Sequence, residues 1–248
     1  MRYEKSRYTY DPKSKGPFKL SRTKIDNFLK CPRCFYLDRR YGVGQPPGFP
    51  FTLNSAVDFL LKKEFDAHRA VGTKHPLMEN YGVDATPFDH TKLSQWRENF
   101  EGIRYHHQPT NFIVFGAIDD VWINSQKELH IVDYKATSKE GAISLDAEWQ
   151  IGYKRQAEVY QWLFRRNDFK VSDTAYFVYV NGRKDREAFD ARLEFDVHLL
   201  PYSGDDSWVE PTLVDIKKTL DNAAIPEANP DCEYCQYSRE RNTVETSS

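Results

Sequence analysis

The stretch from residue 111 to residue 137 constrains the fold of this chain more than any other. Two runs rich in β-branched and aromatic residues, 111–124 and 130–137, lie on either side of a short polar segment. Such residues are typical of strands, and a short polar connection is typical of a turn. The stretch therefore predicts a β-hairpin.

Carboxylates end the apolar part of each run. Asp119 and Asp120 do so in the first run, and Asp133 does so in the second, with Lys135 two positions later. Alternate residues of a strand share a face, so Asp133 and Lys135 should project together, with Asp119 alongside on the neighbouring strand. Because crowded carboxylates repel one another, a divalent metal ion with oxygen ligands is expected beside Lys135. Asp120 is the alternative ligand. An exposed ion pair on a surface hairpin, which contributes little to stability, is the competing interpretation.

This hairpin resembles the core of the PD-(D/E)XK nuclease superfamily, in its RecB-like branch. The segment from Gly116 to Asp119 is similar to the Gly-x-x-Asp strand of that branch. The segment Asp133-Tyr134-Lys135 is similar to its Asp-x-Lys strand. The segment 21–41, a serine-led helix that runs into Cys-Pro and an aromatic pair, resembles the opening of the same nucleases.

A long helix expected from about residue 146 to 166 carries a further part of the resemblance. Gln156 and Tyr160 are four residues apart and share a helix face. They match the Gln-x-x-x-Tyr motif that follows the Asp-x-Lys strand in RecB-like nucleases. The alternative interpretation is that Gln156 and Tyr160 are ordinary half-buried residues without a functional role. The resemblance implies that the pair supports the active site and the substrate backbone.

The resemblance implies an α/β fold with a mixed central β-sheet flanked by helices, which the order of the expected elements also favours. It implies hydrolysis of DNA phosphodiester bonds with Mg²⁺ or Mn²⁺, in repair, recombination or defence. Asp119, Asp133 and the Tyr134 carbonyl would ligate the ion. Lys135 would orient the attacking water and stabilise the charge of the transition state. A role as general base would require a lowered pKa.

Asp58 is a candidate third ligand of this metal ion. It lies in a helix expected from about residue 53 to 70, where the family usually carries a metal-binding histidine. Glu64 is a weaker substitute, and the helix macrodipole alone also explains an aspartate in a first turn. The missing histidine supports an alternative function. The chain would then be a catalytically weakened nucleic-acid-binding or structural subunit of a larger DNA-processing complex.

The four cysteines form two Cys-x-x-Cys pairs, Cys31 with Cys34 and Cys232 with Cys235. In a reducing compartment such pairs indicate a metal site that joins the two ends of the chain. Four thiolates suit Zn²⁺ or a [4Fe–4S] cluster. Cys31 precedes a proline, as does the N-terminal cluster ligand of RecB-like nucleases such as those of CRISPR adaptation. Two complete Cys-x-x-Cys pairs make zinc an equal alternative to the cluster, and both metals stay open here.

The bulk properties allow one large domain in 248 residues with a formal net charge of −2. Affinity for DNA would then come from local basic clusters. The candidates are Arg39 with Arg40, Lys154 with Arg155, Arg165 with Arg166, and Arg183 with Lys184 and Arg186. No apolar run approaches the roughly 20 residues that span a membrane, and the N-terminus has no signal-peptide core. A cytoplasmic protein is expected, with DNA and a helicase or other DNA-processing protein as partners.

We expect a flexible arm over residues 1–19 and a single nuclease domain over 20–240 with a helical insertion at about 53–100. A disordered tail is expected over 241–248. The remaining expected elements are strands at 103–107, 174–180 and 191–200, helices at 92–100 and 205–220, and an irregular segment at 74–87.

Overall fold

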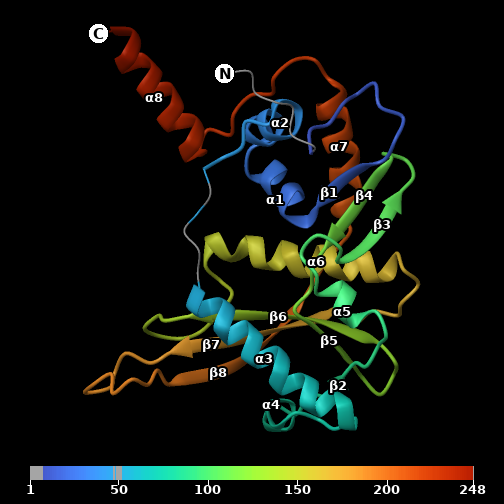
Figure 1. The fold of residues 1–248 in the computed structure, drawn as a ribbon, viewed down its shortest axis with the longest axis vertical. Coiled ribbons are helices and arrows are strands. Elements are labelled where there is room, and N and C mark those ends of the chain that lie inside the picture. Colours follow the sequence, from blue (N-terminus) through green and yellow to red (C-terminus); the bar gives the residue numbers. More distant parts are fainter. Residues whose placement is uncertain (1–7, 47, 49–51, 248) are drawn as a thin grey trace. The chain divides into compact units, whose positions relative to one another are not determined.

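A computed structural model of the protein describes residues 8–46, 48 and 52–247. These residues form a mixed α/β fold with two mixed β-sheets flanked by helices (Figure 1). The predicted α/β class is confirmed, but two sheets stand where one central sheet was expected. The chain divides into two compact units. The first comprises Met1–Phe49, Tyr105–Phe115 and Ser207–Ser248, and the second comprises Pro50–Arg104 and Gly116–Asp206.

The second unit is built on a five-stranded sheet with the order β2-β5-β6-β7-β8. Its strands are β2 (Thr86–Pro87), β5 (Asp120–Ile123), β6 (Leu129–Thr137), β7 (Thr174–Gly182) and β8 (Phe195–Ser203). Strand β6 is parallel to β7, and the other neighbouring pairs are antiparallel. The predicted strands at 130–137 and 174–180 are therefore present as β6 and β7.

The predicted hairpin exists in part, as the antiparallel pair β5–β6 with Asp120 opposite Val132. The first apolar run, however, is not one strand. Its beginning is β4 (Phe112–Gly116), which belongs to the three-stranded sheet. The chain then leaves the ladder, and the backbone N–H of Ile118 bonds to the carbonyl of Trp96 at 3.1 Å. Asp119 consequently lies in a short bend, one residue before β5.

A glycine lets the backbone approach this bend closely. Gly102 has a φ of +58°, in the left-handed region, and a Cβ at this position would lie 2.3 Å from the carbonyl oxygen of Gly116. Any larger residue would push against the first residue of the Gly-x-x-Asp segment. Gly102 thus helps to fix the path of the chain toward Asp119.

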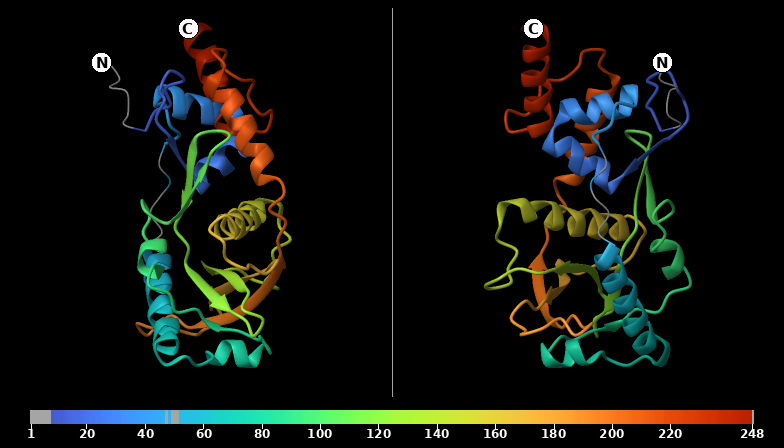
Figure 2. Two further views of the ribbon diagram at one scale, coloured as in Figure 1. Left: turned by 90° about the vertical axis from the view of Figure 1, so that its right-hand side faces the viewer. Right: turned by 60° about the vertical axis from the view of Figure 1, so that its left-hand side comes forward.

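The two faces of β6 carry different chemistry. Val132 and Tyr134 point into an apolar core, where the ring of Phe65 from α3 (Thr52–Val71) stacks on Tyr134 at 5.7 Å. Asp133 and Lys135 point to the other face, toward α6 (Ile151–Arg165). Helix α6 follows a short 3₁₀ turn, η1 (Glu148–Gln150). In Figure 2 (left), α3 and α6 lie on opposite sides of this sheet.

The first unit holds the three-stranded sheet, with the order β1-β4-β3, and β1 runs parallel to β4. Its elements are β1 (Phe18–Ser21), α1 (Arg22–Lys30), α2 (Pro32–Tyr41), most of β3 (Ile103–His107), most of β4, α7 (Val209–Asp221) and α8 (Glu233–Ser247). Helix α7 begins four residues after the predicted start at 205. The described helices include none long and apolar enough to cross a membrane.

The terminal segments are more ordered than predicted. The flexible arm expected over 1–19 is docked from residue 8 onward, because the Tyr10 ring is buried and its hydroxyl donates to Asp221 at 2.6 Å. Residues 1–7 lie outside the described part. The disordered tail expected over 241–248 instead continues α8 to Ser247. An Arg241–Glu245 ion pair one helix turn apart supports this exposed end of the helix.

Three predicted elements in the second unit differ from the structure. The segment 74–87, expected to be irregular, contains α4 (Pro76–Asn80) and β2. The helix expected over 92–100 is only α5 (Leu93–Trp96), and Phe100 is 80% exposed, so no buried stripe prolongs it. The strand expected at 191–200 begins at Phe195, because Asp190 and Ala191 have positive φ angles and form a turn.

Candidate active site

A pocket of about 460 Å³ lies where α3, β6 and α6 of the second unit meet. Asp119 contributes to its wall from the bend before β5, and Asp58 contributes from α3. The complete lining is Asn54, Ser55, Val57, Asp58, Leu61, Asp119, Tyr134, Lys135, Ala136 and Tyr153. The pocket therefore gathers four predicted site residues from three separate segments: Asp58, Asp119, and Tyr134 with Lys135.

Lys135 forms an ion pair with Asp133 on the same face of β6, as the strand alternation predicted. Asp133 is only 1% exposed. Burial lowers the pKa of Lys135, but the charges of Asp133 and Asp119 together raise it by more. The pKa of Lys135 is therefore above its ordinary value. Lys135 is thus held as an ammonium ion. This state suits the stabilisation of negative charge and does not suit proton abstraction.

Asp119 is fixed by the strand that carries Lys135. One of its carboxylate oxygens accepts a hydrogen bond from the backbone N–H of Tyr134 at 2.9 Å. The other lies 3.6 Å from the ammonium of Lys62, which belongs to α3. The Asp119 carboxylate is therefore held by the backbone of β6 through one oxygen and faces Lys62 of α3 with the other.

Asp58 faces the same pocket as Asp119. Its carboxylate lies 2.8 Å from the ammonium of Lys62, one helix turn later. Glu64 makes a different contact, with His75 at 2.8 Å, and does not line the pocket. Of the two candidate acidic ligands in α3, only Asp58 lines the same pocket as Asp119.

Residues of α6 complete the surroundings of Lys135. The Lys135 ammonium donates to the Gln156 side chain at 3.4 Å and lies 4.4 Å from the centre of the Tyr153 ring. The Tyr160 hydroxyl donates to the carbonyl of Ala117, inside the Gly-x-x-Asp segment. Gln156 thus contacts the lysine directly, whereas Tyr160 holds the bend that carries Asp119.

Asp120, the alternative ligand, has a different environment. It is fully buried, and it pairs with two arginines, Arg69 of α3 and Arg97. The Arg97 side chain also donates to the backbone carbonyl of Asp119 at 2.9 Å, and both arginines reach Asp66. With these partners Asp120 is an internal counter-ion and not a pocket ligand. The arginines fix the backbone on which Asp119 stands.

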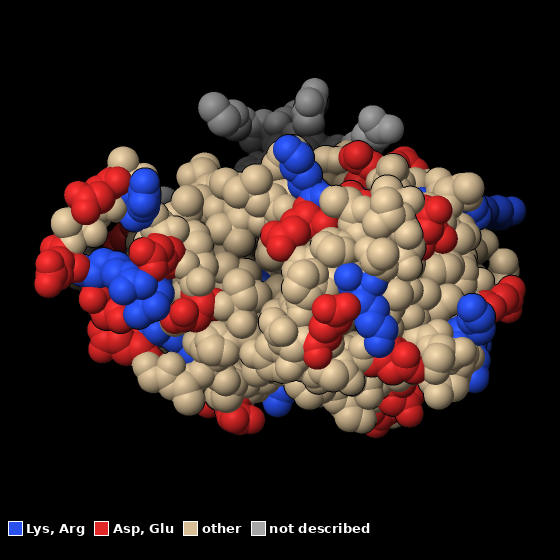
Figure 3. Space-filling view, turned by 90° about the horizontal axis from the view of Figure 1, so that it is seen from below, with Lys and Arg blue, Asp and Glu red and all other residues tan. Residues whose placement is uncertain are grey.

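Most of the expected basic clusters are neutralised by neighbouring carboxylates. Arg39 pairs with Asp38, and Arg183 pairs with Asp185. Arg165 and Arg186 have acidic partners too. Lys154 lies over the ring of Tyr202 instead. The face in Figure 3 likewise mixes basic and acidic side chains over a larger uncharged surface.

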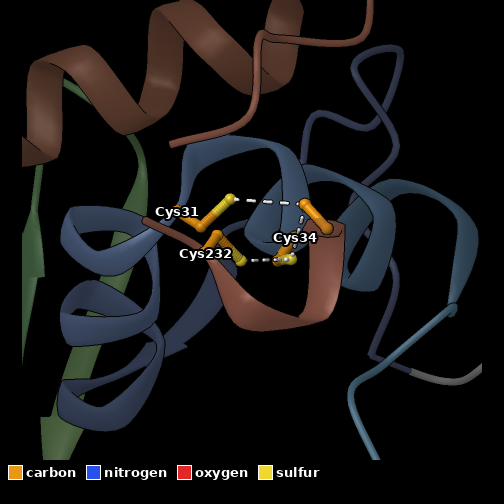
Figure 4. A group of neighbouring side chains, drawn as sticks. Cys31, Cys34 and Cys232 are labelled. Atoms are coloured by element: carbon orange, nitrogen blue, oxygen red, sulfur yellow. Dashed lines mark hydrogen bonds between the residues drawn. The ribbon is translucent and has the colours of Figure 1, made fainter. Parts of the chain in front are cut away.

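The four cysteines meet in the first unit, as the spacing predicted (Figure 4). Cys31 lies between α1 and α2, and Cys34 lies in the first turns of α2. Their sulfur atoms approach those of Cys232 and Cys235, with Cys34 at 3.6 Å from Cys232 and 3.5 Å from Cys235. Cys31 lies 3.9 Å from Cys235. Among the described residues, only these four form a group of three or more metal-ligand side chains mutually within 4.8 Å.

The electrostatics of the cysteine group favour deprotonation of one cysteine, Cys31, over that of its neighbours Cys34 and Cys235. Burial raises the pKa of Cys31, but hydrogen bonds from the backbone at Cys34 and Asn229 outweigh this effect, and the pKa falls to about 7. Burial raises the pKa of Cys34 and Cys235. A second negative charge among four adjacent sulfur atoms needs a neutralising cation, which a bound metal would supply.

Sequence reasoning missed the basic residues that surround the carboxylates. Lys62 had a local signal, because it follows Asp58 by four residues on one helix face. Arg69 follows Asp66 by three residues, which is also a local signal. Arg97 had none, since its partners lie 31 and 23 residues away along the chain. Only the folded chain reveals that contact.

Comparison with known proteins identifies the superfamily of this chain. A family model described as the PD-(D/E)XK nuclease superfamily matches residues 59–239, more than half of the chain. The match contains Asp119, Asp133 and Lys135, whereas Asp58 precedes it. The solved structure titled "Crystal structure of SSO0001" is 15% identical, with a TM-score of 0.41 over 92% of this chain and 86% of that one. No curated protein matches the chain. The chain belongs to the PD-(D/E)XK nuclease superfamily.

Proposed function

We propose that this protein is a metal-dependent nuclease of the RecB-like branch that hydrolyses phosphodiester bonds in DNA. The observation that carries the proposal is the position of Lys135. Its ammonium pairs with Asp133 and is stabilised by the charge of Asp119, at the wall of a pocket that Asp58 also lines. Carboxylates and a charged lysine are the groups that a phosphodiester reaction needs.

The donor set fits a hard divalent cation such as Mg²⁺ or Mn²⁺. Aspartate oxygens are the ligands these ions prefer, and Mg²⁺ retains several waters, so two or three carboxylates suffice. Asp119 and Asp58 line the pocket, and buried Asp133 pairs with Lys135. These three residues, with the Tyr134 carbonyl, would hold the ion. A bound ion neutralises the phosphate and lowers the pKa of a water molecule.

The protein's own groups then have separate tasks. Lys135, protonated, stabilises the charge that develops on the phosphorus-bound oxygens. Gln156 restrains its ammonium from α6, and Tyr153 places an electron-rich ring against it. Tyr160 and Arg97 hold the carbonyls of Ala117 and Asp119, which fixes the bend that presents the Asp119 carboxylate.

Aromatic residues beside the pocket support a nucleic-acid substrate. Trp149 is 62% exposed, and its ring contacts that of Tyr153, which lines the pocket, at 5.5 Å. Buried Gln150 anchors the same turn by a bond to the carbonyl of Ser144 at 2.9 Å. A fixed, exposed indole next to the reacting phosphate offers a surface on which a base can stack.

Cleavage of labelled DNA tests this function. Single- and double-stranded DNA, with RNA of the same sequence, are incubated with Mg²⁺ or Mn²⁺, and EDTA serves as the blank. The wild type should cleave DNA, and Asp119→Ala should not. Asp89→Ala, which replaces an exposed aspartate of the same unit, should cleave like the wild type. Cleavage by Asp119→Ala would exclude this pocket, and binding of DNA without cleavage would support a non-catalytic subunit.

We infer that the four cysteines hold a single zinc ion. At a Zn–S distance of about 2.3 Å, tetrahedral geometry separates the sulfur atoms by roughly 3.8 Å. The contacts of 3.5, 3.6 and 3.9 Å between the cysteine sulfurs support that arrangement. A [4Fe–4S] cluster places four iron atoms between its ligands, which would hold the same sulfur atoms farther apart.

A further inference from the structure

One charged residue beside the pocket, Lys62, has no part in the chemistry described so far. The ammonium of Lys62 lies 2.8 Å from a carboxylate oxygen of Asp58 and 3.6 Å from one of Asp119. The Lys62 side chain is 23% exposed, so it is partly shielded from solvent while it contacts both carboxylates. It joins α3 to the bend before β5.

The position of Lys62 follows from the charges around it. Asp58 and Asp119 reach the same pocket from different segments, and two neighbouring carboxylates repel each other unless a cation lies between them. Lys135 serves Asp133 in this way, and Lys62 serves the other two aspartates. The group of three aspartates and two lysines then carries a formal charge of −1, from −3 and +2.

A divalent cation would need the oxygens that Lys62 contacts. Metal–oxygen distances of about 2.0–2.6 Å draw two carboxylates around one point, which leaves no room for an ammonium between them. Two cations at such a short distance also repel each other strongly. The four-carbon stem of a lysine is flexible, so Lys62 is able to move aside without a change in the helix.

We propose that Lys62 is a positioning residue that holds Asp58 and Asp119 together in the metal-free protein and competes with the divalent cation for them. The inference rests on the proposed function, because the cation is taken to bind in this pocket. When the cation displaces it, the Lys62 ammonium becomes available to a phosphate of the substrate. Metal and DNA should therefore strengthen each other's binding.

The binding of Mn²⁺ to the whole 248-residue chain, with its cysteine site intact, tests this competition without any need for activity. Affinity is measured by calorimetry and by the electron paramagnetic resonance of free Mn²⁺. Lys62→Met should bind Mn²⁺ about tenfold more tightly than the wild type, since one competing positive charge is removed. Lys62→Arg, which keeps the charge, should resemble the wild type. Lys63→Met, at the neighbouring exposed position of the same helix, is the matched control and should change nothing.

The variant Asp119→Asn separates the failure of this proposal from the failure of the proposed function. If Asp119→Asn loses Mn²⁺ while Lys62→Met binds as the wild type does or more weakly, the pocket holds metal and the competition is refuted. If Asp119→Asn binds Mn²⁺ like the wild type, the pocket is not the metal site and both proposals fail. Circular dichroism of each variant confirms that it is folded before titration.

The effect of bound DNA on the affinity for Mn²⁺ gives a second measurement. With a non-cleaved oligonucleotide whose scissile phosphate is a phosphorothioate, the wild type should bind Mn²⁺ more tightly than without it. In Lys62→Met this gain should shrink, because the lysine that moves to the phosphate is missing. An equal gain in both proteins would refute the movement of Lys62 to the substrate.

Discussion

The hydroxyl of Tyr134 donates a hydrogen bond of 2.8 Å to a carboxylate oxygen of Asp120, and both side chains are buried. Asp120 follows Asp119, and Tyr134 lies between Asp133 and Lys135 in the chain. The bond therefore joins the two strands that carry the pocket residues, on the face opposite Lys135. Burial, and then the charge of Asp120, raises the pKa of Tyr134 well above its usual value, so the phenol stays protonated as a donor.

The substitution Tyr134→Phe should lower the free energy of unfolding by about 1.5–3 kcal/mol, the range for a buried hydrogen bond to a charged group. Urea unfolding at neutral pH measures the loss. Tyr176→Phe is the matched control on the neighbouring strand β7, since burial is the cause of its raised pKa. Equal losses in the two variants would show that the hydrogen bond to Asp120 adds no stability.

The substitution Lys135→Ala should reduce cleavage by about 10²–10³-fold, the effect of removing one group that stabilises transition-state charge. It should also lower the melting temperature, because buried Asp133 loses its counter-ion. The double variant with Asp133→Asn should recover stability without recovering cleavage. Single-turnover cleavage and thermal unfolding measure the two effects, and Lys63→Ala, at an exposed position of the same unit, is the control. If stability and cleavage returned together, Lys135 would be only a structural residue.

The stability of the first unit should depend on Asp38 at low pH. Burial raises the pKa of Asp38, but hydrogen bonds from Arg39 and Lys24 lower it by more. The pKa of Asp38 is therefore below its ordinary value. A lowered folded-state pKa stabilises the protein above the ordinary value of 3.8 and loses that effect as the pH falls through the folded-state pKa. Asp38→Asn should therefore melt below the wild type at neutral pH, and the difference should vanish in strong acid.

Melting curves of both proteins at a series of pH values test this prediction. The matched control is Asp215→Asn, whose ion pair with Lys218 is largely exposed. Exposed pairs add little, so this variant should follow the wild type at every pH. A difference for Asp38→Asn that stayed constant down to the most acidic pH would contradict the role of the charge.

Substitution of any one of the four cysteines by serine should lower the melting temperature of the first unit. The metal would link α2 to the segment that begins α8, about 200 residues later, and its binding energy would add to folding stability. Elemental analysis of the wild type should give one zinc per chain, in a colourless solution. A chelator should lower the melting temperature of the wild type and leave that of Cys34→Ser unchanged. If the protein instead absorbs visible light and contains iron and sulfide, the site holds an iron–sulfur cluster and the zinc proposal is wrong.

The sequence by itself predicted which side chains lie together on β6 and in the cysteine group. The period of two along 130–137 placed Asp133 and Lys135 on one strand face, and the ion pair between them confirms the placement. Two Cys-x-x-Cys pairs predicted one group, and the sulfur atoms of Cys31, Cys34, Cys232 and Cys235 do gather. The strand β7 and the long helix α6 were also evident, because strong local periodicity leaves little choice of structure.

Only the tertiary structure decided how the charges are partnered. The break between β4 and β5 depends on Trp96 and Gly102, which meet the chain near Ile118 and Gly116. Arg97 reaches Asp66 and Asp120 across distances in sequence that no local pattern records. Tyr10 with Asp221, and the arginines of the basic clusters with several of their carboxylates, are likewise brought together only by folding. A charge in a sequence states what it can bind, but its actual partner is the group that folding brings within about 4 Å, where Coulomb attraction in a partly buried setting outweighs screening by water.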